Sequence, residues 1–379
     1  MGNTTSGTWT AVFWGACLAS SGAALAADAI EGIRDQPLAT VLSSGTIWAP
    51  KDVYIGWPTV AKTAEGELMA AFSGDREAHV CPWGKTQIVR SRDNGQTWST
   101  PETVNNTPLD DRDAGIIQTR QGTLVVSWFT SMAFEQNEDY RRHREKILDK
   151  TIEEWLGFWI RRSEDNGKTW GDFIRVETTA PHGPIELADG RLLFVGATAA
   201  QTVQDRVGVI ESRDDGRTWS RIGSIAQAEG DDPNECYEPH VVENADGSLL
   251  AMVRYHGHGP NAHHLRQAFS RDGGKTWTRL EPTPIHGFPP HLIRLKDNRL
   301  VVCYGRRWDP FGERACVSRD GGTTWDVEHK IVLSQAPTGD LGYPASVQLD
   351  DGSIFTVYYE VIEAGAKPPL RYTHWRLKD

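Results

Sequence analysis

Short apolar runs alternate with sharp polar turns along almost the whole chain, and one kind of turn returns at regular intervals. The segment Ser-x-Asp-x-Gly-x-Thr-Trp occurs five times, beginning at Ser91, Ser163, Ser212, Ser270 and Ser318. Each copy follows a short apolar run, which is typical of a strand that ends in a tight turn. In such a turn the Asp accepts hydrogen bonds from backbone amides, the Gly takes a positive φ and the Trp supplies an apolar anchor. Repetition at intervals of roughly 40 to 50 residues is typical of an array of similar β-units.

A second repeated turn sets the number of these units. Turns of the form acid-Gly-x-aliphatic begin at Glu65, Asp189, Asp246 and Asp351, with variants at Gln121 and Asp297. Asn298 replaces Gly in one variant, and Asn tolerates the left-handed conformation that such hairpins need. Six hairpins and five box turns predict an all-β fold, a six-bladed β-propeller with four-stranded antiparallel blades.

The two repeats divide the chain into blades with no linker between them. The blades are expected to begin at Trp57, Asp113, His182, Glu238, Pro289 and Tyr343. Residues 39–42 are expected to supply the outer strand that completes the last blade. The charged stretch 138–155 contains no Gly or Pro and predicts a helix inserted in blade two. This helix either borders the pocket or packs on the surface with its charges in solvent.

The first 26 residues are expected to be a signal peptide, which leaves residues 27–379 for the propeller. Residues 11–26 are small and apolar, and the Ala-Leu-Ala at 24–26 resembles a signal-peptidase site. We therefore expect the protein to be exported, to the periplasm or to the exterior. No other apolar run is long enough to span a bilayer.

Cysteine placement leaves the redox state open. Removal of the signal peptide would leave Cys81, Cys236, Cys303 and Cys316. Cys303 and Cys316 are expected on neighbouring strands of blade five. In an oxidising compartment they either pair or stay as buried thiols.

Charge and motif content exclude several classes of ligand. The formal net charge is −11 and no stripe of Lys or Arg stands out, which argues against nucleic acid. The His pairs at 256–258 and 263–264 lack a third spaced ligand, so no metal site is predicted. No Gly-rich phosphate loop is present, and we expect no nucleotide cofactor.

The uneven, charged segments fall at the starts of first strands and the ends of second strands. Both repeated turns lie at the opposite ends of these strands, so we expect the uneven segments to meet at one mouth of the axis. The first strands contribute Asp113, His182, Glu238, His240, His291 and Tyr343. The second strands contribute Asp75, Arg76, Glu77, His79, Arg254, Arg307 and Glu360. Arginines in an acidic protein indicate an anionic group held by bidentate donors, most simply a sugar carboxylate. A Tyr near Glu and Arg indicates an activated phenol, because nearby cations lower its pKa and the carboxylate can take its proton.

These residues resemble the sialidase superfamily, whose Asp-box repeats are similar to the five box turns. The likeness runs from about residue 57 to residue 360. Arg76, in Phe-Ser-Gly-Asp-Arg, resembles the family arginine that binds the sialic acid carboxylate. Glu238 and Arg254 resemble the family's base and another carboxylate-binding arginine. Tyr343 and Glu360 are similar to the nucleophilic Tyr and the late Glu.

Two positions depart from the family pattern. Trp57, in Gly-Trp-Pro, stands where the family has Arg-Ile-Pro, so one arginine of its triad and the usual partner of Glu360 are missing. The acid/base Asp expected shortly after Arg76 is also missing, and Glu77 and His79 are the nearby substitutes. The candidates for the remaining arginine are Arg306, Arg307 and Arg314.

The leading hypothesis is an exported, exo-acting glycoside hydrolase that releases a terminal acidic sugar. Tyr343 would attack the anomeric carbon with Glu238 as its base, and His79 or Glu77 would protonate the leaving oxygen. Arg76 and Arg254 would hold the carboxylate, and a covalent Tyr intermediate implies retention.

Two other functions remain open. A polysaccharide lyase acting on a uronate-containing glycan would use His79, His182 or His240 as base, with Tyr343 as acid and Arg254 against the carboxylate. A carbohydrate-binding propeller without turnover would explain the missing arginine and the missing acid/base. A lyase product carries a new double bond that absorbs in the near ultraviolet, which distinguishes it from a hydrolase product.

Overall fold

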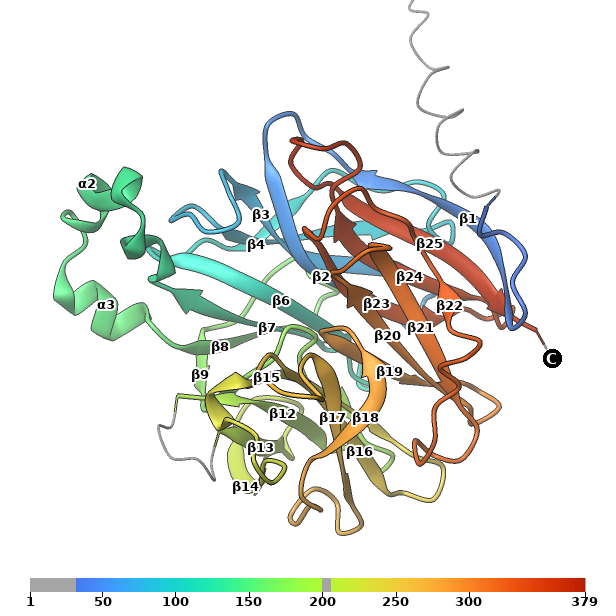
Figure 1. Cartoon of the computed structure of the whole chain (residues 1–379). Coiled ribbons are helices and arrows are strands. Elements are labelled where there is room, and N and C mark those ends of the chain that lie inside the picture. Colours follow the sequence, from blue (N-terminus) through green and yellow to red (C-terminus); the bar gives the residue numbers. More distant parts are fainter. Residues whose placement is uncertain (1–31, 200–205, 379) are drawn as a thin grey trace, which may run out of the picture.

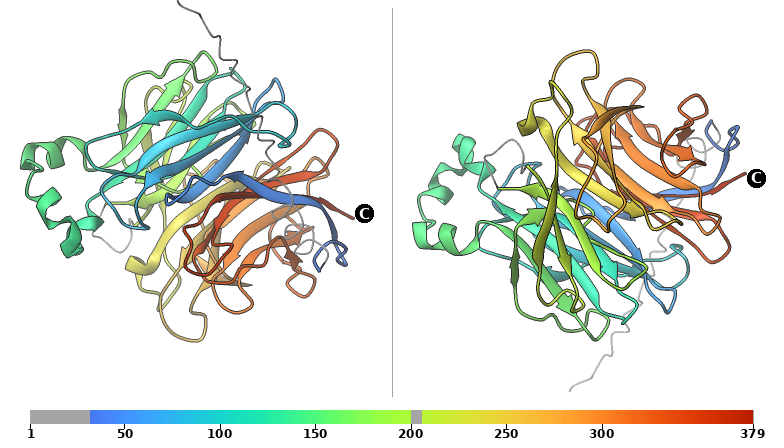
Figure 2. Two further views of the ribbon diagram at one scale, coloured as in Figure 1. Left: turned by 90° about the horizontal axis from the view of Figure 1, so that it is seen from above. Right: turned by 90° about the horizontal axis from the view of Figure 1, so that it is seen from below.

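The computed structural model describes residues 32–199 and 206–378, and its strands form six separate sheets around a common centre (Figure 1 and Figure 2). This arrangement confirms the predicted six-bladed propeller. The expected signal peptide, residues 1–26, lies outside the described residues.

Each blade is an antiparallel sheet, and in blades one to five the strands follow one another in chain order from the centre outward. Blade one contains β2 (Tyr54–Lys62), β3 (Leu68–Arg76), β4 (Lys85–Ser91) and β5 (Glu102–Asn105). Blade two contains β6 (Asp110–Gln118), β7 (Leu124–Ser131), β8 (Phe158–Ser163) and β9 (Ile174–Val176). Blade three contains β10 (Thr178–Thr179), β11 (Ile185–Glu186), β12 (Leu192–Thr198), β13 (Val207–Ser212) and β14 (Ser220–Ile225). Blade four contains β15 (Cys236–Glu243), β16 (Leu249–Tyr255), β17 (His264–Ser270) and β18 (Glu281–His286). Blade five contains β19 (Pro290–Arg294), β20 (Leu300–Arg306), β21 (Gly312–Ser318) and β22 (Ile331–Val332). Blade six contains β23 (Leu341–Gln348), β24 (Ile354–Glu360), β25 (Leu370–Leu377) and, as its outer strand, β1 (Ala39–Trp48). In blade three the inner strand is split, because β10 and β11 both pair with β12.

The ring is closed by the strand nearest the N-terminus. β1 pairs antiparallel with β25, from Ala39 opposite Leu377 to Trp48 opposite Leu370. The outer strand predicted over 39–42 is therefore confirmed and continues to residue 48. Closure pairs a sheet edge that would otherwise expose unpaired backbone groups.

The hydrophobic core lies between the faces of adjacent blades. One cluster joins Ala61, Met69 and Ile88 of blade one to Ile116 and Val126 of blade two, and all five side chains are buried. Strands that are covered on both faces need apolar residues at nearly every position, as β2 and β3 show. Ring assembly therefore derives its stability from inter-blade burial.

The five box turns share one hydrogen-bond pattern. In the first, Asp93 accepts from the backbone N–H of Thr97 at 2.9 Å, and the Ser91 hydroxyl accepts from Gly95 N–H at 2.8 Å. Trp98 Nε1 donates to the Gly95 carbonyl at 3.1 Å. Hydrogen bonds from Thr97 and Ser91 lower the pKa of Asp93 to about 2. The Ser and Asp contacts recur in the other four boxes, so these residues build turns.

The insertion in blade two consists of several short helices. They are η1 (Ala133–Gln136), η2 (Glu138–Tyr140), α2 (Arg141–Arg144) and α3 (Asp149–Trp155), and a further short helix, η4 (Pro233–Glu235), precedes β15. The single helix expected over 138–155 is broken because Leu148 has an extended backbone with ψ of 146°. Tyr140 anchors the insertion by packing with Cys81 and Phe134 in a small separate core.

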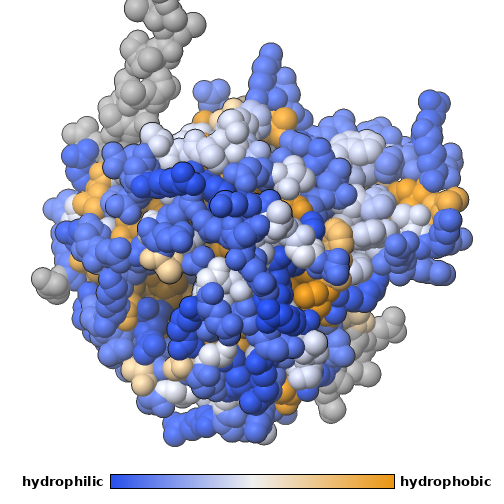
Figure 3. Space-filling model, turned by 180° about the vertical axis from the view of Figure 1, so that it is seen from behind, coloured by the Kyte–Doolittle hydropathy of each residue, from blue (hydrophilic) through white to orange (hydrophobic). Residues whose placement is uncertain are grey.

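The face opposite to that of Figure 1 is mainly polar. Figure 3 shows a mainly hydrophilic face with separate apolar areas, one of them over the helical insertion, where Leu148 and Leu156 are exposed. Over the described ranges, no helix combines the length and apolarity that a bilayer crossing needs.

The four described cysteines are free thiols and all are buried. Cys303 pairs with Ala315 and Cys316 with Val302 across β20 and β21. A register offset of one residue turns the two side chains to opposite faces of the sheet. This geometry decides between the two open possibilities in favour of buried thiols.

Candidate active site

Four inner strands carry the same backbone distortion near their start. Trp57, Asp113, Glu238 and Tyr343 have φ values of 55°, 54°, 52° and 55°. The pairing register with the second strand shifts at each of these positions. A bulge of this kind redirects a side chain, and left-handed backbone at non-glycine residues is concentrated at functional sites. The four blades thus direct an indole, two carboxyl groups and a phenol toward one centre.

Tyr343 and Glu238 form the central pair. The Tyr343 hydroxyl donates a short hydrogen bond to Glu238 Oε1, and Arg254 Nη1 donates to Glu238 Oε2 at 2.7 Å. Arg254 lies 4.0 Å from the ring centroid of Phe288, which fixes the plane of its guanidinium. Tyr343, Glu238 and Arg254 were predicted from sequence, and the fold brings them into contact from blades six and four.

The ionisation of Tyr343 differs from the expectation that nearby cations lower its pKa. Burial, with 4% of the residue exposed, raises this pKa well above its ordinary value, and Glu238 and Asp113 raise it further. The opposing effects of Arg254 and Arg307 are smaller. The phenol therefore keeps its proton at rest, and attack by its oxygen requires transfer of that proton to Glu238.

Arg307 is the arginine that completes this cluster. Its guanidinium carbon lies 5.6 Å from the Tyr343 ring centroid, and its Nη2 donates to the Tyr359 hydroxyl at 3.4 Å. Among the described residues no carboxylate forms an ion pair with Arg307. The other two candidates are used elsewhere, since Arg306 donates to the Asp309 carbonyl and Arg314 to the carbonyls of Glu313, Pro310 and Ser334.

Asp113 is a buried carboxyl group next to the central pair, with 6% of the residue exposed. Burial and the charge of Glu238 raise the pKa of Asp113 to about 7, against the opposing charges of Arg112, Arg76 and Arg254. A carboxyl group that titrates near neutrality can donate a hydrogen bond to a sugar hydroxyl when it is protonated, and can accept one when it is ionised. Asp113 therefore lies beside Tyr343 and Glu238, and its contact with substrate stays a prediction.

Arg76 is buried against Trp57, with its guanidinium carbon 4.6 Å from the Trp57 ring centroid. Only 1% of the residue is exposed, and its Nη1 and Nη2 donate to the two carboxylate oxygens of Asp110 at 2.5 and 2.9 Å. The guanidinium is thus already neutralised, and the predicted role of Arg76 in holding a substrate carboxylate is not supported. Arg112, which the sequence interpretation did not select, lies 4.0 Å over the Trp57 ring. Its position directly before the bulged Asp113 was the available signal.

The predicted residues at the end of β3 and just after it lie in different surroundings. Asp75 is exposed and pairs with Lys85 at 2.8 Å. Glu77 is exposed and accepts from Trp83 Nε1 at 2.8 Å, away from Tyr343 and toward the helical insertion, since Trp83 packs on that insertion. His79 is the residue of this segment that contacts Trp57, with ring centroids 5.2 Å apart.

The three predicted axial histidines pack on one another as a buried cluster. His182 contacts His291 at 4.8 Å between ring centroids, and His240 stacks on His291 at 4.4 Å. Burial lowers the pKa of His240 to about 3 and those of His182 and His291 well below the ordinary value. Neutral, buried rings of this kind contribute to packing around the central axis. Direct contact of the three histidines with substrate is therefore not supported.

A pH dependence of stability follows from the histidine cluster. The unfolded chain binds a proton at His240 below about pH 6.5 while the folded chain does not, so the free energy of unfolding falls as the pH drops. Between pH 6.5 and 5.0 the free energy of unfolding should fall by about 2 kcal/mol less in His240→Gln than in the wild type. Urea unfolding at the two pH values measures this difference, and the exposed His329→Gln serves as the control. An unchanged pH dependence in His240→Gln would contradict the assignment.

Glu360 is held by neighbouring residues of the fold. It is buried, accepts from Ser334 Oγ at 2.6 Å and has Arg371 at 3.5 Å. Arg371 takes the place of the family partner that Trp57 replaces. Burial raises the pKa of Glu360 and, more strongly, that of the neighbouring Glu313. The predicted substrate contact by Glu360 is therefore not supported.

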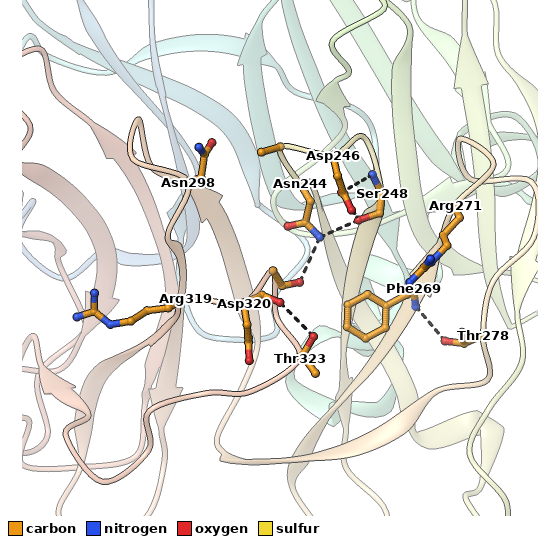
Figure 4. Close-up of a pocket in the computed structure, with 12 residues that line it drawn as sticks. Asn244, Asp246, Ser248, Phe269, Arg271, Thr278, Asn298, Arg319, Asp320 and Thr323 are labelled. Atoms are coloured by element: carbon orange, nitrogen blue, oxygen red, sulfur yellow. Dashed lines mark hydrogen bonds between the residues drawn. The ribbon is translucent and has the colours of Figure 1, made fainter.

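A separate crevice of about 530 Å³ lies among the turns of blades four and five. Figure 4 shows its lining, in which Asn244 donates to Ser248 and to the carbonyl of Gly321, both at 3.1 Å. Asp320 belongs to a box turn, and none of the catalytic candidates lines the crevice. It is a gap between neighbouring turns, apart from the Tyr343 cluster.

Comparison with known proteins places the chain in a family. The BNR repeat-like domain family matches residues 116–356. A sialidase of Bacteroides fragilis is 24% identical over 342 residues, which is 79% of this chain and 59% of the relative, so the chain spans about three fifths of that protein. A solved protein of unknown function from Dyadobacter fermentans has a TM-score of 0.75 at 26% identity and covers 90% of this chain and 100% of its own. The Hadza microbial sialidase Hz136 has a TM-score of 0.64 at 19% identity, over 85% and 65% of the two chains. The chain therefore belongs to the BNR repeat-like domain family and is sialidase-like.

Proposed function

We propose that this protein is an exo-acting glycoside hydrolase that releases a terminal sugar bearing a carboxylate, with retention of configuration. The observation that carries the proposal is the hydrogen bond from Tyr343 to Glu238 between two arginines, Arg254 and Arg307. A buried phenol bonded to a carboxylate has the arrangement of an activated nucleophile. The two guanidinium groups supply planar donors for the sugar carboxylate.

The geometry supports a two-step reaction. The Tyr343 oxygen attacks the anomeric carbon while its proton passes to Glu238, and the leaving oxygen departs with a proton from a third group. Water then attacks the same carbon and gives a proton to the third group, and Glu238 returns its proton to Tyr343 as the covalent bond breaks. Tyr nucleophiles of this kind are the sialidase exception to hydrolysis by paired carboxylates. A phenol also avoids bringing a second negative charge against the substrate carboxylate.

The substrate is proposed to be sialic acid or a related acidic sugar. The sialidases of Bacteroides fragilis and Clostridium perfringens support this class, at 24% and 23% identity. Trp57 replaces the family arginine, and its ring packs in a buried cluster with Tyr54 and Tyr343, which places an aromatic group beside the nucleophile. We also propose export after removal of residues 1–26, which N-terminal sequencing of the mature protein would test.

The test is incubation with sialyl and glucuronosyl glycosides, followed by product analysis. Free sugar acid with retained anomeric configuration, observed by proton NMR at early times, is the expected result. An unsaturated product absorbing in the near ultraviolet would identify a lyase. Binding without any product over the whole panel would identify a carbohydrate-binding propeller and contradict the proposal.

The carboxylate ligand gives a specific prediction. Arg307→Ala should raise KM for the acidic substrate by about 100-fold with a smaller change in kcat, because a charge-assisted hydrogen bond to the carboxylate is lost. Steady-state kinetics measure the change, and the surface variant Arg376→Ala is the control. An unaltered KM would place the substrate carboxylate elsewhere.

A further inference from the structure

The segment that carries His79 is held from beneath by two arginines of a buried network. The His79 carbonyl accepts from Arg76 Nη2 and from Arg112 Nη1, each at 3.1 Å. Asp110 binds Arg76 through both carboxylate oxygens, and Arg112 approaches one of them at 3.5 Å. This network gives Arg76 a purpose other than binding substrate, because it fixes the backbone at His79.

The imidazole of His79 is held from the side by a second pair of residues. Its Nδ1 lies 2.7 Å from the Tyr54 hydroxyl, and the same hydroxyl donates to Asp340 Oδ1 at 2.7 Å. A carboxylate only accepts, so the single hydroxyl proton of Tyr54 goes to Asp340. His79 Nδ1 must therefore donate to Tyr54, which leaves the lone pair of the neutral ring on Nε2.

The ring stands beside Trp57, at the border of the Tyr343 cluster. Its side chain is 47% exposed, and it packs edge-on against Trp57, which in turn lies 6.3 Å from the Tyr343 ring. No other described residue bonds Nε2. An imidazole with a fixed tautomer, a free nitrogen and access from solvent has what proton transfer to a substrate requires.

We propose that His79, oriented by Tyr54 and Asp340, is the residue that exchanges protons with the leaving oxygen and with the attacking water. This inference rests on the proposed hydrolase function. In the first step the bond from the anomeric carbon to the leaving oxygen breaks as the bond to Tyr343 forms, and protonated Nε2 gives its proton to that oxygen. In the second step Nε2 takes a proton from water, whose oxygen replaces Tyr343 on the carbon. Tyr54 and Asp340 are positioning residues.

The charges around His79 couple its protonation to substrate binding. Partial desolvation and the charges of Arg112, Arg307, Arg76 and Arg254 lower the pKa of His79 below its ordinary value, so the ring is neutral in the empty site. Tyr54 and Asp340 face it from the other side. A substrate carboxylate bound by Arg254 and Arg307 adds one negative charge beside these cations. The pKa of His79 therefore rises on binding, which favours the protonated ring that the first step consumes.

Nitrogen-15 NMR of histidine-labelled protein tests this coupling without turnover. We expect His79 to be protonated at Nδ1 in the free protein and its titration midpoint to rise when sialic acid or D-glucuronate is bound. Comparison with the His79→Ala spectrum assigns the signal. Tyr54→Phe removes the hydroxyl that fixes the tautomer, so both tautomers of His79 should then be populated. Protonation at Nε2 in the free protein, or a bound sugar acid that leaves the midpoint unchanged, would overturn the inference.

Kinetics with two leaving groups provide the second test. His79→Ala should lower kcat about 10²- to 10⁴-fold for a sialyl-lactose, whose leaving oxygen needs a proton, and less than about 10-fold for an aryl sialoside. Tyr54→Phe should show the same dependence on the leaving group with a smaller loss. The controls are His329→Ala and Tyr372→Phe, both outside the site.

The outcomes separate this inference from the proposed function. A wild-type protein that hydrolyses neither substrate refutes the hydrolase and, with it, the catalytic role of His79. An active wild type whose His79→Ala variant acts equally well on both substrates overturns the present inference alone. If Asp113→Asn, and not His79→Ala, produces the dependence on the leaving group, Asp113 is the proton donor.

Discussion

Tyr343→Phe is expected to lower kcat by about 10³- to 10⁴-fold while leaving the fold intact, the loss typical of removing a nucleophile from a preorganised site. The change removes one oxygen from a buried ring that packs with Trp57 and Tyr359, so the apolar contacts of the ring remain. Glu238 keeps its bond to Arg254 at 2.7 Å and is not left without a partner. The effect should therefore appear in catalysis and not in stability.

Two measurements make this expectation decisive. Circular dichroism and the urea midpoint of Tyr343→Phe should match the wild type, and Tyr372→Phe, outside the site, should keep full activity. Denaturation during turnover of a slow fluorinated substrate should yield a peptide containing Tyr343 with the sugar attached. Full activity of Tyr343→Phe would rule out the covalent mechanism.

Asp110→Asn is expected to destabilise the protein by about 3 to 5 kcal/mol, the cost of leaving a buried charge without its counter-ion. The side chains of Asp110 and Arg76 are both 0% exposed, and two hydrogen bonds join them. An Asn offers one acceptor and turns an NH₂ group toward the guanidinium. The variant should also lose activity, since the network under His79 loosens.

Urea-induced unfolding of the wild type and the variant measures this cost. Asp350→Asn is the matched control, because Asp350 is 80% exposed and pairs with Lys62 at the surface. Exposed pairs contribute at most about 1 kcal/mol, so this variant should be nearly as stable as the wild type. Equal stability of Asp110→Asn and wild type would show that water or another group satisfies Arg76.

The sequence by itself determined the architecture and the central pair of the site. The box turns and hairpins are local, since the Asp93 carboxylate bonds a residue four positions away, and local patterns are legible without a structure. Their count gave six blades. Tyr343, Glu238 and Arg254 lie where strands begin or end beside the expected mouth, and the resemblance to the sialidase superfamily distinguished them from the other candidates there.

Only the tertiary structure decided which charged residues reach the Tyr343 cluster and which are already bound in ion pairs within the fold. The partner of Arg76 is 34 residues away in the next blade, and Tyr54 and Asp340 are separated by 286 residues. Arg307 could be distinguished from its neighbour Arg306 only when the Tyr343 ring was placed. The physical reason is that ring closure sets these contacts: the side chains of a charged segment look equivalent in sequence, but burial and the partner across the ring decide which charges are already neutralised.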